Sequence, residues 1–179
     1  MAPSEARSLG YASYSPRVAR HLPALKVRVR SATVLDVPDI QRLAADKGSR
    51  GVSPSSLEVA IADPQRKVVV ATMDDVVVGW AKTHFWDLSD GPAAAGHYLG
   101  GVMVASEIRR HGVGDALTSA RLDWIWKRAR KTWFVVNALN LASIDLHRKW
   151  GFCEVARNHR FHTTTFTGGE GILFSAESR

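Results

Sequence analysis

One strand–loop–helix stretch restricts the possible folds of this chain more than any other. The apolar run Val102–Val104 leads into Arg109 and Arg110, and Gly112 and Gly114 then open a segment long enough for a helix. A helix N-terminus presents unpaired N–H groups and the positive end of a dipole, so an anion binds there favourably. Glycine allows close approach to the backbone, and arginine pairs with phosphate. The pattern therefore indicates either a diphosphate-binding loop or a glycine-rich turn with solvated arginines. It matches neither the P-loop nor the Rossmann fingerprint.

Strand and helix patterns alternate around this stretch. Val27 and Val29 alternate with arginines as in a half-buried strand, and a helical face follows Asp36. Residues 53–58 are typical of a capped helix start with Pro54 as the first helical residue. The further strands are expected at 67–72, 76–86, 98–104, 133–138, 152–161 and 171–176, and the further helices at 112–131 and 142–150. This order predicts a single-domain α/β fold with a mixed central sheet of about seven strands and about four helices.

The net charge of +7 is concentrated near the N-terminus. Residues 1–30 contain six basic residues and one acidic residue, which leaves only +2 for the remainder. We interpret residues 1–24 as a flexible basic leader and residues 25–179 as the folded domain. A solvated tail is favoured over nucleic-acid binding, and a transit peptide is the least favoured interpretation.

Other bulk features point to a cytoplasmic protein. The chain contains no apolar stretch of the ~20 residues that a membrane span needs and no apolar signal region. Its single cysteine, Cys153, excludes a disulfide within the chain, so a reducing compartment is expected. We expect no membrane partner and no metal, and a homodimer is left open.

A second motif follows about 25 residues after the loop. It contains Asn140, Ser143, His147, Gly151 and Phe152. With this motif, the sequence resembles the GNAT superfamily of N-acetyltransferases. The acetyl-CoA loop of that superfamily reads Arg/Gln-x-x-Gly-x-Gly/Ala, which is matched by Arg109, Gly112 and Gly114. Its later motif has an asparagine, a small residue three positions on, a tyrosine or histidine seven on, and Gly-Phe at eleven and twelve. The matching residues are Asn140, Ser143, His147, Gly151 and Phe152.

The resemblance implies a particular acetyl-CoA site. The backbone of strand residues 102–104 would bind the pantetheine arm, and a backbone N–H there, assigned to Met103, would stabilise the oxyanion. Residues 110–115 would hold the diphosphate. Asn140 would bind the pantetheine arm, although a plain helix N-cap is its alternative role. The implied acetyl-CoA-binding residues are Val102, Met103, Val104, Arg109, Arg110, His111, Gly112, Val113, Gly114, Asp115, Asn140 and Ser143.

The resemblance also implies proton-transfer groups. His147 occupies a position where tyrosine is commoner and would protonate the departing thiolate; its alternative is a histidine that only packs or caps. Strands 99–104 and 133–137 contain no carboxylate to act as general base. The candidates are His97, His84 and Asp87, or a chain of water molecules. Trp80 and Trp86 either pack in the core or line an acceptor pocket.

The resemblance implies an N-acetyltransferase that moves an acetyl group from acetyl-CoA to a primary amine by direct attack. The acceptor is a small molecule or a protein or peptide amine, and the sequence does not distinguish among them. One alternative is a longer acyl donor such as succinyl-CoA. Another is a CoA-binding module that has lost catalysis and has a regulatory or nucleic-acid-binding role.

Overall fold

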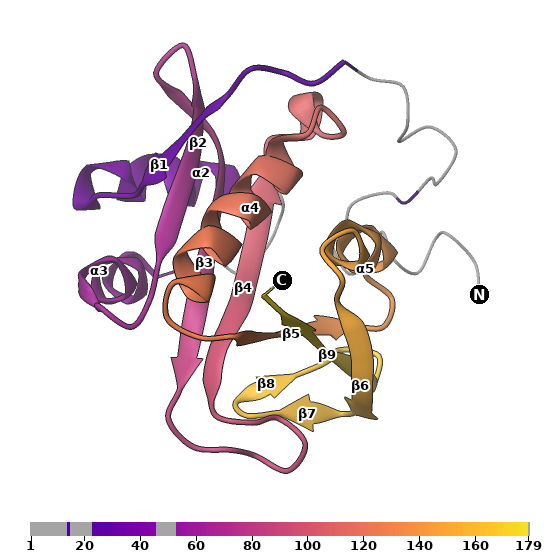
Figure 1. Ribbon diagram of the computed structural model, residues 1–179. Coiled ribbons are helices and arrows are strands. Elements are labelled where there is room, and N and C mark those ends of the chain that lie inside the picture. The colour runs from indigo at the N-terminus through magenta and orange to yellow at the C-terminus, as the bar shows by residue number, and fades with distance from the viewer. Residues whose placement is uncertain (1–13, 15–22, 46–52, 179) are drawn as a thin grey trace. The chain divides into compact units, whose positions relative to one another are not determined.

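The computed structural model describes residues 14, 23–45 and 53–178 (Figure 1). Most of the predicted leader, 1–24, therefore lies outside the described residues. The described chain divides into two compact units. We call residues 23–45, 53–84 and 100–124 the first unit, and residues 85–99 and 125–178 the second unit. Strand pairing follows the order β1-β2-β3-β4-β5-β9-β6 in a mixed sheet, so the predicted α/β fold with a seven-stranded central sheet and four α-helices is confirmed for the described part.

The first unit combines an antiparallel meander with helices. Its elements are β1 (Arg28–Ser31), η1 (Val34–Asp36), α2 (Val37–Ala45), α3 (Pro54–Ala62), β2 (Val68–Met73), most of β3 (Val76–Trp86), the second half of β4 (Gly96–Val104), η2 (Ser106–Ile108) and most of α4 (Val113–Trp126). Ile40, Leu57, Val70 and Leu117 lie in its core. Helix α4 packs on β3 at Gly79, because a Cβ there would lie 3.2 Å from Leu117 Cδ1.

Local sequence signals explain two of these elements. Asp74 and Asp75 both have a positive φ, as a two-residue hairpin turn requires, so β2 pairs with β3 as predicted. Pro54 is the first residue of α3, also as predicted. The expected cap is not formed, because the Ser53 hydroxyl pairs with that of Ser55 at 2.7 Å instead of capping the helix.

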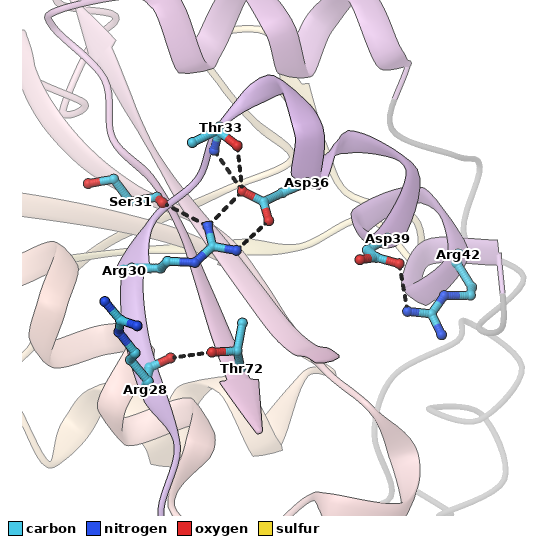
Figure 2. A network of polar contacts seen from close by, with 8 residues as sticks. All are labelled: Arg28, Arg30, Ser31, Thr33, Asp36, Asp39, Arg42 and Thr72. Carbon is cyan, nitrogen blue, oxygen red and sulfur yellow. Dashed lines mark hydrogen bonds and ion pairs between the residues drawn. The ribbon is translucent and has the colours of Figure 1, made fainter. Parts of the chain in front are cut away.

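A buried carboxylate anchors the start of α2. The Asp36 Oδ1 and Oδ2 atoms accept hydrogen bonds from the Arg30 guanidinium at 2.6 and 2.7 Å (Figure 2). The same carboxylate accepts from the Thr33 N–H at 2.7 Å and the Thr33 hydroxyl at 3.1 Å. These bonds, with that of Arg30 first, lower the pKa of Asp36 to about 2. The network ties β1 to the turn that precedes α2.

The second unit contains the C-terminal strands and one helix. It contains the end of β3 and the first half of β4. Its complete elements are β5 (Lys131–Asn137), α5 (Leu141–Arg148), β6 (Cys153–Asn158), β7 (Arg160–Phe161), β8 (Thr164–Thr165) and β9 (Gly171–Glu177). Strand β5 pairs antiparallel with β9, and β4 pairs parallel with β5 at Tyr98 and Leu99. Gly151, with a φ of 80°, follows α5 as predicted for a helix end.

Two predicted boundaries are wrong. Helix α4 ends at Trp126 and not near 131, because the N–H groups of Arg128 and Ala129 both bond to the Ile125 carbonyl and close the helix with a turn. The predicted strand 152–161 is two strands, and β7 turns through His162, whose φ is 49°, to pair with β8. None of the helices in the described ranges has the length and hydropathy of a membrane span.

Candidate functional site

The loop before α4 lies wholly in the first unit and has an unusual backbone. Arg110 and Gly112 both adopt a positive φ, of 69° and 81°. A left-handed conformation is ordinary for glycine but costs about 1–2 kcal/mol for arginine, so the surrounding contacts must enforce it. Left-handed residues are found in backbone turns whose N–H groups gather into a concave anion site. Helix α4 then begins at Val113.

Arg109 fastens this loop to the strand that precedes it. Its Nε donates to the Val104 carbonyl at 3.2 Å, and burial lowers the pKa of its guanidinium. The structure therefore gives Arg109 a loop-holding contact in addition to the predicted role toward a diphosphate. The sequence did not predict this contact, because an arginine at that position indicates a positive charge but not the backbone carbonyl that it bonds.

The end of the predicted leader contacts the same loop. The Leu25 N–H donates to the His111 carbonyl at 3.0 Å, and the His111 Nδ1–H donates to the Pro23 carbonyl at 2.7 Å. A Cβ on Gly112 would lie 3.8 Å from the Ala24 side chain. Pro23 and Ala24, which belong to the predicted leader, thus contact this loop in the described part of the chain.

The strand expected to bind the pantetheine arm is the second half of β4. Val102, Met103 and Val104 are partly buried and pack against the core of the first unit. The Met103 carbonyl would lie 3.1 Å from a Cβ on Gly79, so β3 and β4 are in close backbone contact there. The role of the Met103 N–H toward an oxyanion stays a prediction.

In the second unit, Asn140 is the N-cap of α5. Its Oδ1 accepts from the Ser143 N–H at 3.2 Å, which is the alternative role considered for it from the sequence. The cap uses the oxygen of the side chain and leaves the amide nitrogen as the chemically suitable donor to a ligand carbonyl. The two roles are therefore compatible.

His147 is buried on the inner side of α5, with 1% of its surface exposed. Its ring stacks on Phe134, with centroids 3.8 Å apart, and meets the edge of Phe152 at 5.7 Å. The Nδ1–H donates to the Ser143 carbonyl at 2.7 Å. This bond sets the ring orientation and directs any proton exchange with a ligand to Nε2. Asn140 and His147 thus both bond to the backbone of Ser143.

The three candidate bases differ in their surroundings. Burial, then the charges of Lys82 and Arg66, lowers the pKa of His84 to about 4. Burial, then Arg128, lowers the pKa of His97, whose ring lies 4.9 Å from that of Phe85. Asp87 is exposed. Both histidines are neutral near pH 7, and the low pKa makes His84 a weak base.

Trp80 and Trp86, for which the sequence left core packing and an acceptor pocket as alternatives, have different environments. Trp80 is buried in the core of the first unit with 3% of its surface exposed. Trp86 is partly buried in the second unit and stacks on His162 at 4.4 Å with nearly parallel rings. Core packing therefore accounts for Trp80. Within the described ranges, no group of three or more His, Cys, Asp or Glu side chains could hold a metal ion.

The family model described as "Acetyltransferase (GNAT) family" matches residues 37–152, which include both the loop and α5. The chain belongs to the acetyltransferase (GNAT) family. It is accordingly an acetyltransferase, and the predicted family is confirmed. No curated protein matches the sequence.

Solved structures of this family share the fold at low sequence identity. The ribosomal-protein-S18-alanine N-acetyltransferase of Escherichia coli is 20% identical, with a TM-score of 0.68 over 85% of this chain and 94% of that one. A ribosomal-protein-alanine N-acetyltransferase of Brucella melitensis is 24% identical, with a TM-score of 0.69 over 84% and 99%. The putative acetyltransferase yncA of Salmonella typhimurium, solved with acetyl-CoA, is 20% identical, with a TM-score of 0.68 over 84% and 93%. At these identities the likeness concerns the fold.

Proposed function

We propose that this GNAT acetyltransferase moves the acetyl group of acetyl-CoA to a primary amine by direct attack of the amine nitrogen. The observation that best supports this proposal is that the matched family region includes both the loop before α4 and the Asn140–His147 segment. The amine forms a bond to the carbonyl carbon while the bond to sulfur breaks, so the products are an amide and the free thiol of CoA. The nitrogen loses one proton, which passes to water or to one of the candidate bases, and the departing thiolate gains one proton, so the protons balance.

The loop before α4 fits a diphosphate on two grounds of its own structure. Arg110 and Gly112 are left-handed, as residues of anion-binding backbone turns often are, and the N-terminus of the long helix α4 follows directly. In our proposal the backbone of residues 110–115 binds the diphosphate, and Arg109 keeps the loop closed against β4. Acetyl-CoA supplies the acyl thioester when it is bound.

The Asn140–His147 segment supplies the remaining groups that we propose. Asn140 donates its amide N–H to the pantetheine arm while its oxygen caps α5. His147 gives a proton through Nε2 to the departing thiolate, with Ser143 holding the ring in place. A neutral ring whose Nδ1 is the donor has Nε2 unprotonated, so His147 must first take up a proton before it can act as an acid.

The proposal is tested by incubating the full chain with acetyl-CoA and a panel of primary amines, with released thiol as the readout. The panel includes amino acids, their amides, diamines, aminoglycosides and peptides with free N-termini. We expect thiol release that requires both acetyl-CoA and one class of amine, and a product heavier by one acetyl group in mass spectrometry. CoA binding without thiol release for any amine would refute it in favour of the noncatalytic module.

A further inference from the structure

A fully buried arginine links α4 to β3 and β4 within the first unit. Arg121 in α4 is 0% exposed, and its Nε donates to the Leu117 carbonyl at 3.2 Å. Its Nη1 donates to the carbonyls of Lys82 in β3, at 3.2 Å, and Gly100 in β4, at 3.0 Å. Its Nη2 donates to the Thr118 hydroxyl at 3.1 Å. All four acceptors are neutral, so these bonds hold a backbone geometry and form no ion pair.

The bond to Gly100 holds β4 at the point where that strand loses a neighbour. In the described part of the chain, β4 pairs with β5 at Tyr98 and Leu99 and at no later residue. Gly100 follows directly, and the strand segment 102–104, which we propose to bind the pantetheine arm, begins two residues further on. Backbone carbonyls that are removed from water require a donor, and at Gly100 the helix supplies one through Arg121.

The bond to Thr118 extends the same connection to the start of α4. The Thr118 hydroxyl accepts from Arg121 and donates to the Gly114 carbonyl at 2.8 Å. A threonine in a helix often bonds the carbonyl four residues earlier, so the bond to Gly114 alone is ordinary. The bond from Arg121 makes Thr118, which is also 0% exposed, a link between the strands and the first turn of α4. That turn belongs to the segment 110–115, which we propose to bind the diphosphate.

We propose that Arg121 is a positioning residue of the acetyl-CoA site and fixes the spacing between the strand segment 102–104 and the loop segment 110–115. The inference rests on the proposed function, because that function assigns the two segments to the pantetheine arm and the diphosphate. These parts of acetyl-CoA are joined covalently, so both segments bind at once only when their spacing matches the ligand. Apolar packing of α4 on β3 is non-directional, whereas hydrogen bonds fix a register. Arginine suits this task better than lysine, since its planar fork of five N–H groups reaches several acceptors at once.

The first test uses matched substitutions at Thr118 and measures the Kd of CoA calorimetrically with the full chain. Thr118→Val keeps the volume of the side chain but removes the hydroxyl, so it should raise Kd by about fivefold or more, the scale of one hydrogen bond. Thr118→Ser keeps the hydroxyl and loses a methyl group, so its Kd should stay within about twofold of wild type. Equal Kd values for the two variants would overturn the inference.

A control in the same helix distinguishes positioning from general stability. Leu122 is 0% exposed, so Leu122→Val should lower Tm through lost packing but leave the Kd of CoA within about twofold. Arg121→Lys keeps the charge but not the fork and should raise Kd by about tenfold or more. With a confirmed acceptor, the KM for acetyl-CoA should rise in parallel while kcat stays within about threefold. If the Kd of every variant, Leu122→Val included, rose in step with the fall in Tm, Arg121 would only stabilise the fold and the inference would be wrong.

The binding measurement separates this inference from the proposed function, because it needs no amine. If wild type bound CoA but acetylated no amine, the proposed function would be refuted, and a higher Kd in Thr118→Val would still support the inference. If wild type acetylated an amine and bound CoA as tightly as Thr118→Val and Arg121→Lys do, the inference would be overturned and the proposed function would stand.

Discussion

Replacing His147 with phenylalanine should separate proton transfer from packing. The ring of phenylalanine keeps the stack on Phe134, so the main structural loss is the Nδ1–H bond to the Ser143 carbonyl. One such bond contributes about 1 kcal/mol net, which corresponds to a fall in Tm of about 2–4 °C for a domain of this size. Loss of a positioned acid should lower kcat by about 10²-fold or more, or about 2.7 kcal/mol in the barrier.

The assay measures kcat and kcat/KM from pH 6 to 9 with a confirmed acceptor, together with Tm. The KM for acetyl-CoA should change much less than kcat, because the loop before α4 is untouched. His147→Tyr should recover part of the rate and lose the imidazole limb of the pH profile. Phe152→Leu is the control, since it loosens the same cluster without removing a proton-bearing atom. A nearly normal kcat in His147→Phe would show that His147 only packs, and the reasoning would be refuted.

Three further predictions follow from the described contacts. Gly112→Ala and Gly112→Asp both place a side chain at a φ of 81°, so both should destabilise the fold by about 1–2 kcal/mol. Calorimetry should show a large loss of CoA affinity only for the aspartate variant. Equal CoA affinities of the two variants would show that this loop does not bind CoA. Asp36→Asn should cost about 2 kcal/mol in urea unfolding at pH 7, because the fall in pKa from 3.8 to about 2 is about 1.8 units at about 1.36 kcal/mol each. This cost should disappear as the pH falls through that range, where the folded wild type loses the same charge, and a cost that persists at pH 2 would contradict the assignment to Arg30. The pKa of His84 is about 4 in the folded chain and 6.5 ordinarily, so the unfolded chain takes up a proton at higher pH than the folded chain. The free energy of unfolding of wild type should therefore fall by up to about 3 kcal/mol between pH 7 and pH 4. In His84→Gln this free energy should depend less on pH, and an unchanged pH dependence would show that His84 is not the group responsible.

Signals between near neighbours predicted much of the fold from the sequence alone. The aspartate pair at 74 and 75 accepts positive φ values, Pro54 begins a helix, and the period of Ile40, Leu43 and Ala44 defines a buried face. The spacing of the loop and the asparagine motif indicated the family. These features depend on turn chemistry and on periodicity, which act over a few residues. The end of α4 was missed because the turn at Ile125 has no glycine or proline to mark it.

The tertiary structure decided the environment of each candidate group. The sequence showed His84 and Lys82 only as basic residues of a strand, but the pKa values of both depend on Arg66, which lies in the connection between α3 and β2. The burial of Arg121 and its bonds to the carbonyls of Lys82 and Gly100 span 39 and 21 residues of sequence. Desolvation and charge coupling depend on distance in space, so residues that are remote in the chain set them and no local pattern records them.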